Sequence, residues 1–434
     1  MPVLHVVHCI DTEGPLTETL EATFGRLRSA FAIDLPPSRE TLRRLQNCEI
    51  DLAGREEAVA RMLSPELLAY NSSWDDIRVM LDDAMSPDFR RKMVDGRGGG
   101  WVYSWHCMDH MYYAENPRSK DVGYGHVFRF YREMIAKTRS PDELNWHFHP
   151  RSITGYPLHA ATSFVNSYEL LTEILCRRIL EDGWFPVVNR PGFHAERPDS
   201  HAFLEQWIPF DYANQVHEDE VDQPDLAGGR FGDWRRAPHS WRGYRPHHDD
   251  YQVEGHCRRV IFRCLNVGTR LRSLLPHHVR QAFVEARDHG VAILSFADHD
   301  YRDIRPDVEA VRSMLRDAMG DFRDVELRFS GAEAAARDLL GVADAPMPEL
   351  IIRRDGARVE VELKSGQIFG PQPFLALKLV DGCYRHDNLD LQTPGKAWSY
   401  ILDDQTMPPD QVSEVAVGAA GRHGGFSVAK LKLA

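Results

Sequence analysis

The first 340 residues alternate between short apolar runs and longer amphipathic stretches. The apolar runs have the length of buried strands, and the stretches between them repeat apolar residues every three to four positions, as helices on a core do. The predicted strands are 4–10, 101–105, 145–150, 184–188, 210–213, 259–265 and 291–296, and the predicted helices are 16–31, 127–136, 167–180, 199–207 and 274–288. This alternation predicts an α/β fold whose parallel sheet is closed, or nearly closed, into a barrel.

Three stretches depart from the repeat. Residues from about 35 to 100 predict a helical insertion that ends in the glycine-rich segment 96–100, and residues 216–251 predict a long ordered loop. From residue 346 apolar and polar positions alternate, with Asp-Gly turns, which predicts an all-β, sandwich-like module. We therefore divide the chain into a barrel domain, 1–340, and an accessory β domain, 346–434.

The charge and the apolar content of the chain exclude some classes of partner. The chain has 52 Lys and Arg against 65 Asp and Glu, a net charge of -13, which argues against nucleic acid as the partner. No apolar run is long enough to span a bilayer, and no leader segment precedes the first strand, so we expect a cytoplasmic protein without membrane insertion. The seven cysteines are scattered and include no Cys-x-x-Cys pair, which is more typical of reduced thiols than of a disulfide framework or a zinc ribbon. The β domain could contact a carbohydrate or pair two copies into a homo-oligomer.

The first strand ends in two acids. Asp11 and Glu13 are two positions apart, so on a strand they project from one face about 7 Å from each other. The carboxyl ends of parallel strands are where α/β proteins bind ligands and metals. The alternative is a solvated turn.

A histidine pair lies at the tip of the third predicted strand. His147 and His149 share one face of a strand, and both imidazoles could reach one ion at about 2.0 to 2.1 Å. With a carboxylate from the first strand they would form a three-ligand site that leaves positions open for water and substrate.

These motifs resemble those of the polysaccharide deacetylases with the NodB homology domain, in particular a divergent branch associated with bacterial surface-polysaccharide (O-antigen) gene clusters. By this resemblance Asp11 is the catalytic base and Glu13 a metal ligand, although the family usually has a second aspartate and no residue such as Thr12 between the two acids. His147 and His149 match the metal histidines, which the family usually spaces four residues apart.

The remaining motifs of the family follow in order. Arg190, before Pro191 and Phe193, matches the arginine that orients the base, the pair Asp233 and Trp234 matches the fourth motif, and His299 matches the general acid. The resemblance covers roughly residues 3 to 320. It implies a deformed (β/α)7-type barrel and metal-dependent removal of an N-acetyl, or similar acyl, group from a sugar.

The chemistry of amide hydrolysis assigns the same roles. A metal polarises the carbonyl and acidifies water, a base takes the water proton, and an acid protonates the leaving amine. Arg190 would keep Asp11 ionised, and His299 would be the acid. Two alternatives stay open: Arg190 could pair with Asp199 or Glu196, and His299 could be a surface histidine.

Further residues near these motifs could contact the substrate. His106 and His110 could line its pocket, form another metal site, or be structural histidines, and the cluster 247–250 is more typical of a charged turn. Aromatic residues at the motifs suit stacking on sugars, although buried tryptophans are usually core residues. The predicted substrate-binding residues are His106, His110, Trp105, Phe193, Asp233 and Trp234.

The expected function is therefore a metal-dependent sugar N-deacetylase with a carbohydrate substrate. One carboxylate and two imidazoles suit zinc by default, and also cobalt, nickel, iron or manganese. An amidase of a non-sugar amide and a non-catalytic glycan-binding or scaffold protein are the alternatives.

Overall fold

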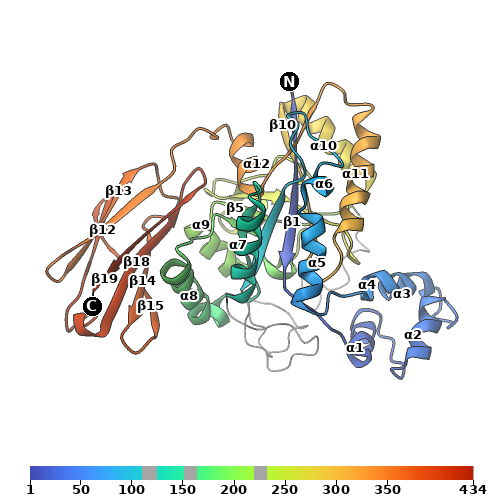
Figure 1. Cartoon of the computed structure of the whole chain (residues 1–434), viewed down its shortest axis with the longest axis horizontal. Helices are drawn as coiled ribbons and strands as arrows, with labels where there is room; N and C mark the ends of the chain where they lie inside the picture. Colours follow the sequence, from blue (N-terminus) through green and yellow to red (C-terminus); the bar gives the residue numbers. More distant parts are fainter. Residues whose placement is uncertain (110–124, 151–163, 219–231, 434) are drawn as a thin grey trace.

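The computed structural model describes residues 1–109, 125–150, 164–218 and 232–433. Figure 1 shows three regions: a central sheet surrounded by helices, a lobe of short helices from an early part of the sequence, and antiparallel sheets from its last part. Among the described residues, no helix combines the length and apolar composition needed to cross a bilayer.

The central sheet is a nearly closed parallel barrel. Its order is β8-β5-β4-β3-β2-β1-β10-β9, and β11 also pairs with β1. The two ends of this order, β8 and β9, are separated in the chain only by Cys264, whose N–H donates to the carbonyl of Asn214 on β5 at 2.8 Å. The predicted parallel sheet is thereby confirmed. Its strands are β1 (Val3–Thr12), β2 (Tyr103–Asp109), β3 (Glu143–Phe148), β4 (Val188–Asn189), β5 (Phe210–Asn214), β8 (Val260–Arg263), β9 (Leu265–Asn266), β10 (Val291–His299) and β11 (Glu326–Phe329).

Helices cover the outside of the barrel and bury both faces of its strands. All ten residues of β1 are buried, as expected of a strand between a barrel interior and a helical layer. The covering helices are α7 (His126–Thr138), α8 (Tyr168–Arg177) with its π-helical continuation η2 (Arg178–Asp182), α9 (Pro198–Trp207), α10 (Pro276–His289), α11 (Arg305–Met319) and α12 (Ala332–Leu339).

Three predicted boundaries differ from the structure. The strand predicted at 184–188 is reduced to β4, because Pro186 has no N–H to donate to a ladder. Strand β2 extends to Asp109, so His106 lies within the strand and not beyond its end. The loop predicted at 216–251 contains the start of a small hairpin, β6 (Pro246–His247) with β7 (Asp250–Glu254).

A buried carboxylate joins β3 to the start of α12. The Glu143 side chain accepts the backbone N–H groups of Glu333 at 2.8 Å and Ala334 at 3.0 Å. Burial, with the nearby Glu333 charge, raises the pKa of Glu143 to about 7. An unfolded glutamate titrates at about 4.3. The folded chain therefore keeps a proton that the unfolded chain loses between these two values.

We expect this group to weaken the fold as the pH rises from about 4 to about 7. Glu143→Gln removes this titration. The difference in unfolding free energy between the variant and the wild type should therefore shift by about 1 to 3 kcal/mol in favour of the variant as the pH rises from 5 to 8. Melting temperatures of both proteins at pH 5, 6, 7 and 8 measure this. A difference between the two proteins that stays constant across the series would contradict the assignment.

The helical insertion has two parts. Helices α1 to α4 form the lobe at the lower right of Figure 1 and enclose a separate small core that includes Phe24, Leu27, Leu45 and Val59. Helix α5 instead packs its buried residues on the barrel core. The helices are α1 (Leu20–Phe31), α2 (Arg39–Gln46), α3 (Glu56–Met62), α4 (Pro65–Leu68), α5 (Trp74–Ala84) and α6 (Pro87–Arg90).

The C-terminal region consists of two four-stranded antiparallel sheets, ordered β12-β13-β17-β16 and β15-β14-β18-β19. They enclose a core that includes Val361, Leu377, Trp398 and Val415. The strands are β12 (Glu349–Asp355), β13 (Arg358–Ser365), β14 (Phe374–Leu379), β15 (Tyr384–Asp387), β16 (Asp390–Thr393), β17 (Ala397–Ile401), β18 (Val412–Ala420) and β19 (Phe426–Lys432).

The second of these sheets packs against the barrel helices. Phe374 of β14 lies 5.3 Å, ring to ring, from Trp207 at the end of α9. A Cβ on Gly418 of β18 would lie 2.9 Å from Ile179, so the absence of a side chain allows this sheet to approach η2 closely. The apolar cluster of the barrel therefore continues into β14 and β18.

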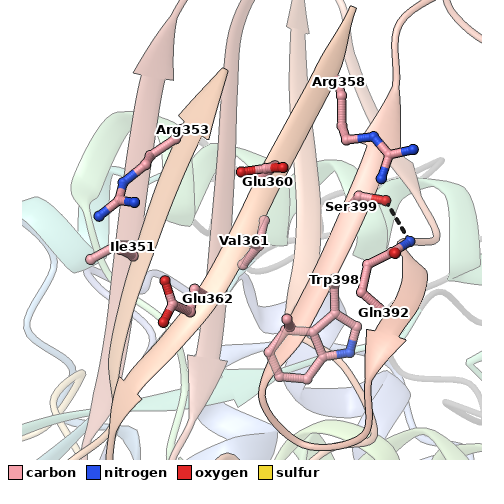
Figure 2. A pocket seen from close by; sticks show the side chains of 10 residues that line it. Ile351, Arg353, Arg358, Glu360, Val361, Glu362, Gln392, Trp398 and Ser399 are labelled. Atoms are coloured by element: carbon pink, nitrogen blue, oxygen red, sulfur yellow. Dashed lines mark hydrogen bonds between the residues drawn. The ribbon is translucent and has the colours of Figure 1, made fainter. Parts of the chain in front are cut away.

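The other sheet turns a polar face outward. This face has a groove of about 250 Å³. Figure 2 shows side chains of both charges along it, such as Arg353, Arg358 and Glu360. Gln392 donates to the Ser399 hydroxyl across it at 2.9 Å. Strand alternation places these residues opposite the sandwich core.

Candidate metal and catalytic site

The site lies at the carboxyl end of β1. Asp11 is in register with His106 of β2 on one side and His299 of β10 on the other. The chain turns away after Thr12, whose hydroxyl donates to the carbonyl of His106 at 3.0 Å. Asp11 and Glu13 are both buried, so the alternative of a solvated turn does not apply.

Glu13, His147 and His149 converge as a buried triad. Their ligand atoms all lie within 4.8 Å of one another. The Nε2 atoms of the two histidines are 2.8 Å apart, and His149 Nε2 is 3.7 Å from a Glu13 carboxylate oxygen. The structure thus brings together the three residues predicted as metal ligands.

The tautomer of His147 suits metal binding. Its Nδ1 lies 2.7 Å from the carbonyl oxygen of Arg190. Because a carbonyl can only accept, Nδ1 carries the proton, and Nε2 presents its lone pair to the triad. Metal-ligating histidines commonly have such a carbonyl behind them, and one carboxylate with two imidazoles is a suitable donor set for a divalent ion.

Arg190 holds Asp11 in place. Its Nε donates to Asp11 at 2.7 Å, and one Nη donates to the Tyr212 carbonyl at 2.9 Å. Burial lowers the pKa of Arg190, but the Asp11 carboxylate, together with Cys264 and Cys9, raises it above its ordinary value. A charged guanidinium is therefore fixed against one carboxylate oxygen of Asp11.

The alternative partners of Arg190 are bonded to other groups. Glu196 forms a buried ion pair with Arg259. Asp199 accepts the backbone N–H of Val165 at 2.9 Å. The pairing of Arg190 is therefore with Asp11.

His299 faces the same space from β10. Its Nε2 is 3.8 Å from Asp11 and 4.0 Å from Glu13, and its side chain is 15% exposed. It belongs to the site and is not a surface histidine in a charged turn. Its partial exposure places it where a substrate could meet it.

The segment after Arg190 wraps around His149. A Cβ on Gly192 would lie 2.5 Å from the His149 ring, so this position needs glycine. The Phe193 ring is 5.0 Å from that of His149, and Phe193 and His194 both have left-handed backbones, at φ 55° and 50°. Two consecutive strained residues are typical of functional sites.

His194 is a site residue that the sequence did not suggest. Burial is the main reason why the pKa of His194 is well below the usual range, and the positive charge of Arg190 is the next. His299 and His147 lower this pKa further. A neutral imidazole thus follows directly on Phe193, whose ring lies 5.0 Å from that of His149. Its position four residues after Arg190 was the only signal in the sequence.

The other predicted substrate-binding residues do not lie together: they occupy the barrel interior, the hydrophobic core and the surface. His106 is fully buried next to Asp11, and burial and Arg190 hold its pKa well below the usual range. Trp105 stacks on Tyr131 in the core. Trp234 is also buried and donates to the His194 carbonyl at 2.9 Å, while Asp233 pairs with Arg235 at the surface. His110 lies outside the described residues.

Two other groups of potential ligands are less suitable. In the group His217, Glu218 and His278, the Nδ1 of His278 accepts the Leu275 N–H, so its proton is on the Nε2 that faces Glu218. Arg263 also donates to Glu218. The group His247, His248 and Asp249 is solvent-accessible, as a charged turn would be. The buried triad is the best-formed ligand set among the described residues.

The comparison with protein-family models finds no match, and the comparison with curated proteins finds none either.

Proposed function

We propose that this chain is a metal-dependent N-deacetylase that acts on a sugar of a bacterial surface polysaccharide or its precursor. One observation carries the proposal: the Asp11–Arg190 pair lies beside the Glu13, His147 and His149 triad, and His299 faces both acids. A metal site alone would need neither a base nor an acid next to it.

The residues have distinct parts in the reaction. A divalent ion on the triad, zinc by default, would polarise the amide carbonyl and make a water molecule more acidic. Asp11 takes the proton from water with its other carboxylate oxygen, because Arg190 occupies the first oxygen and orients the carboxylate. His299, on the more accessible side, delivers a proton to the amine nitrogen as the C–N bond breaks.

We also propose that the barrel is of the (β/α)7 type. Strands β8 and β9 follow one another across Cys264 and would count as one strand of the ring. Strand β11 pairs with Val3–Val6 on the same edge of β1 that pairs with β2 from His8 onward, so it would lie outside the ring.

Acetate release tests the function. The wild type, purified without a chelating tag, would be loaded with zinc, cobalt or manganese and offered N-acetylglucosamine oligomers, UDP-N-acetylglucosamine and, as a non-sugar amide, N-acetylglycine. We expect acetate from at least one sugar and a loss of the reaction after chelation that added metal restores. Release from N-acetylglycine alone would favour the amidase alternative. A metal-loaded protein that deacylates no acylated amino sugar would overturn the proposal.

A further inference from the structure

Asp300, directly after His299, is a buried acid to which neither the motifs nor the mechanism assigns a role. Its carboxylate accepts the backbone N–H of Glu13 at 2.7 Å and that of Gly14 at 3.0 Å. The Tyr131 hydroxyl donates to the same carboxylate at 2.9 Å. Two backbone N–H groups just after β1 and one side chain of α7 thus converge on one anion.

These hydrogen bonds take the place of the bonds between strands beyond the end of β1. Strand β1 ends at Thr12, so the N–H groups of Glu13 and Gly14 have left the sheet while Glu13 must still point at the two histidines. Gly14 has a left-handed backbone at φ 76°, and a Cβ there would lie 3.0 Å from Trp74. The direction of the Glu13 side chain therefore depends on what holds this turn.

The helical insertion reaches the same place. The Asn71 side chain donates to the Asp300 carbonyl at 2.8 Å, and the Asn71 N–H donates to the Tyr301 carbonyl at 2.8 Å. The Leu16 N–H in turn donates to the Asn71 carbonyl at 2.9 Å. Three parts of the chain, around Asn71, Tyr131 and Asp300, therefore fix the turn that contains Glu13.

We propose that Asp300 is a positioning residue that orients Glu13 as a metal ligand. The inference rests on the metal site of the proposed function. Its physical basis is that a buried carboxylate can accept both N–H groups of the turn, whereas a neutral amide would direct an NH₂ group at one of these donors. Groups that orient the side chains that bind a metal typically contribute about 10- to 100-fold to metal affinity.

The test measures metal affinity and not turnover. Zinc and cobalt dissociation constants of the full chain would be determined by competition with a chelator, together with the cobalt absorption spectrum and the melting temperature. We expect Asp300→Asn to weaken both metals by about 10- to 100-fold and to change the cobalt spectrum. Tyr131→Phe removes one bond to Asp300 and should weaken binding by about two- to tenfold.

Asp142→Asn is the matched control. Asp142 is also a buried aspartate that accepts a backbone N–H, that of Tyr103 at 3.0 Å, but it directly precedes β3, at the opposite end of the strands from the site, and pairs with Arg90. We expect this variant to have a lower melting temperature than the wild type and the same metal affinity. A merely structural role of Asp300 would give the same pattern in Asp300→Asn.

The outcomes separate the two proposals. Wild-type affinity and spectrum in Asp300→Asn would overturn the positioning role, and if that variant does not fold, unchanged affinity in Tyr131→Phe would overturn it. A wild type that binds neither metal would overturn the metal site itself, and with it the proposed function.

Discussion

Asp11→Asn is expected to lower the rate of amide hydrolysis by about 10²- to 10⁴-fold while the metal stays bound. Asparagine has nearly the shape of aspartate, and its carbonyl oxygen can still accept the Arg190 Nε–H that Asp11 accepts at 2.7 Å. An amide cannot take a proton from water at neutral pH. The loss would therefore fall on catalysis and not on the fold or the triad.

Single-turnover acetate release and elemental analysis of the same preparation measure this effect. Asp142→Asn again serves as the control, because Asp142 is a buried acid held by an arginine away from the site. A variant of Asp11 that keeps its rate would show that another group is the base. Loss of the metal from Asp11→Asn would instead make Asp11 a ligand.

Glu13→Ala and His149→Ala are each expected to remove the bound metal. Each change deletes one of the three ligands proposed among the described residues, so the loss of affinity should exceed the roughly 10- to 100-fold that is lost when a group that orients a ligand is changed. The wild type should contain about one divalent ion per chain when it is purified without a chelating tag. Either variant should contain little metal after dialysis and should be inactive.

Elemental analysis of the dialysed proteins decides the location of the ion. His217→Ala, in the second group of potential ligands, is the control and should keep the wild-type content. If the triad variants keep the ion and His217→Ala loses it, the metal site lies at the second group. The base and acid assigned to Asp11 and His299 would then lose their basis.

The strand-tip residues were predictable because short-range rules place them. A period of two puts His147 and His149 on one face of β3, and parallel strands bring their carboxyl ends to one edge. The pairing of Arg190 with Asp11 was harder, because the residues are 179 positions apart and nearer acids were available. Only the order of strands in the barrel decides which acid meets the arginine.

Other roles could not be inferred from local pattern. The role of Asp300 was not visible, because two of its partners are backbone N–H groups that no sequence pattern marks and the third, Tyr131, is distant in the sequence. Trp105 and His106 are neighbours on β2, so their side chains point to opposite faces, and only the histidine shares the interior with Asp11. Without the register, an aromatic residue beside a motif gives no indication of which face it occupies.

The continuous apolar cluster between the barrel and the β14–β18 sheet limits how the protein can be divided. Removing the chain from β12 onward would open Trp207 and Ile179 to water, since Phe374 and the strand around Gly418 cover them. Contiguous apolar surface of this kind promotes association. The C-terminal sheets therefore cannot be removed without harm to the barrel. A recombinant fragment that lacks them would aggregate, and a chimera that takes these sheets from a relative would also need the barrel surface that matches them.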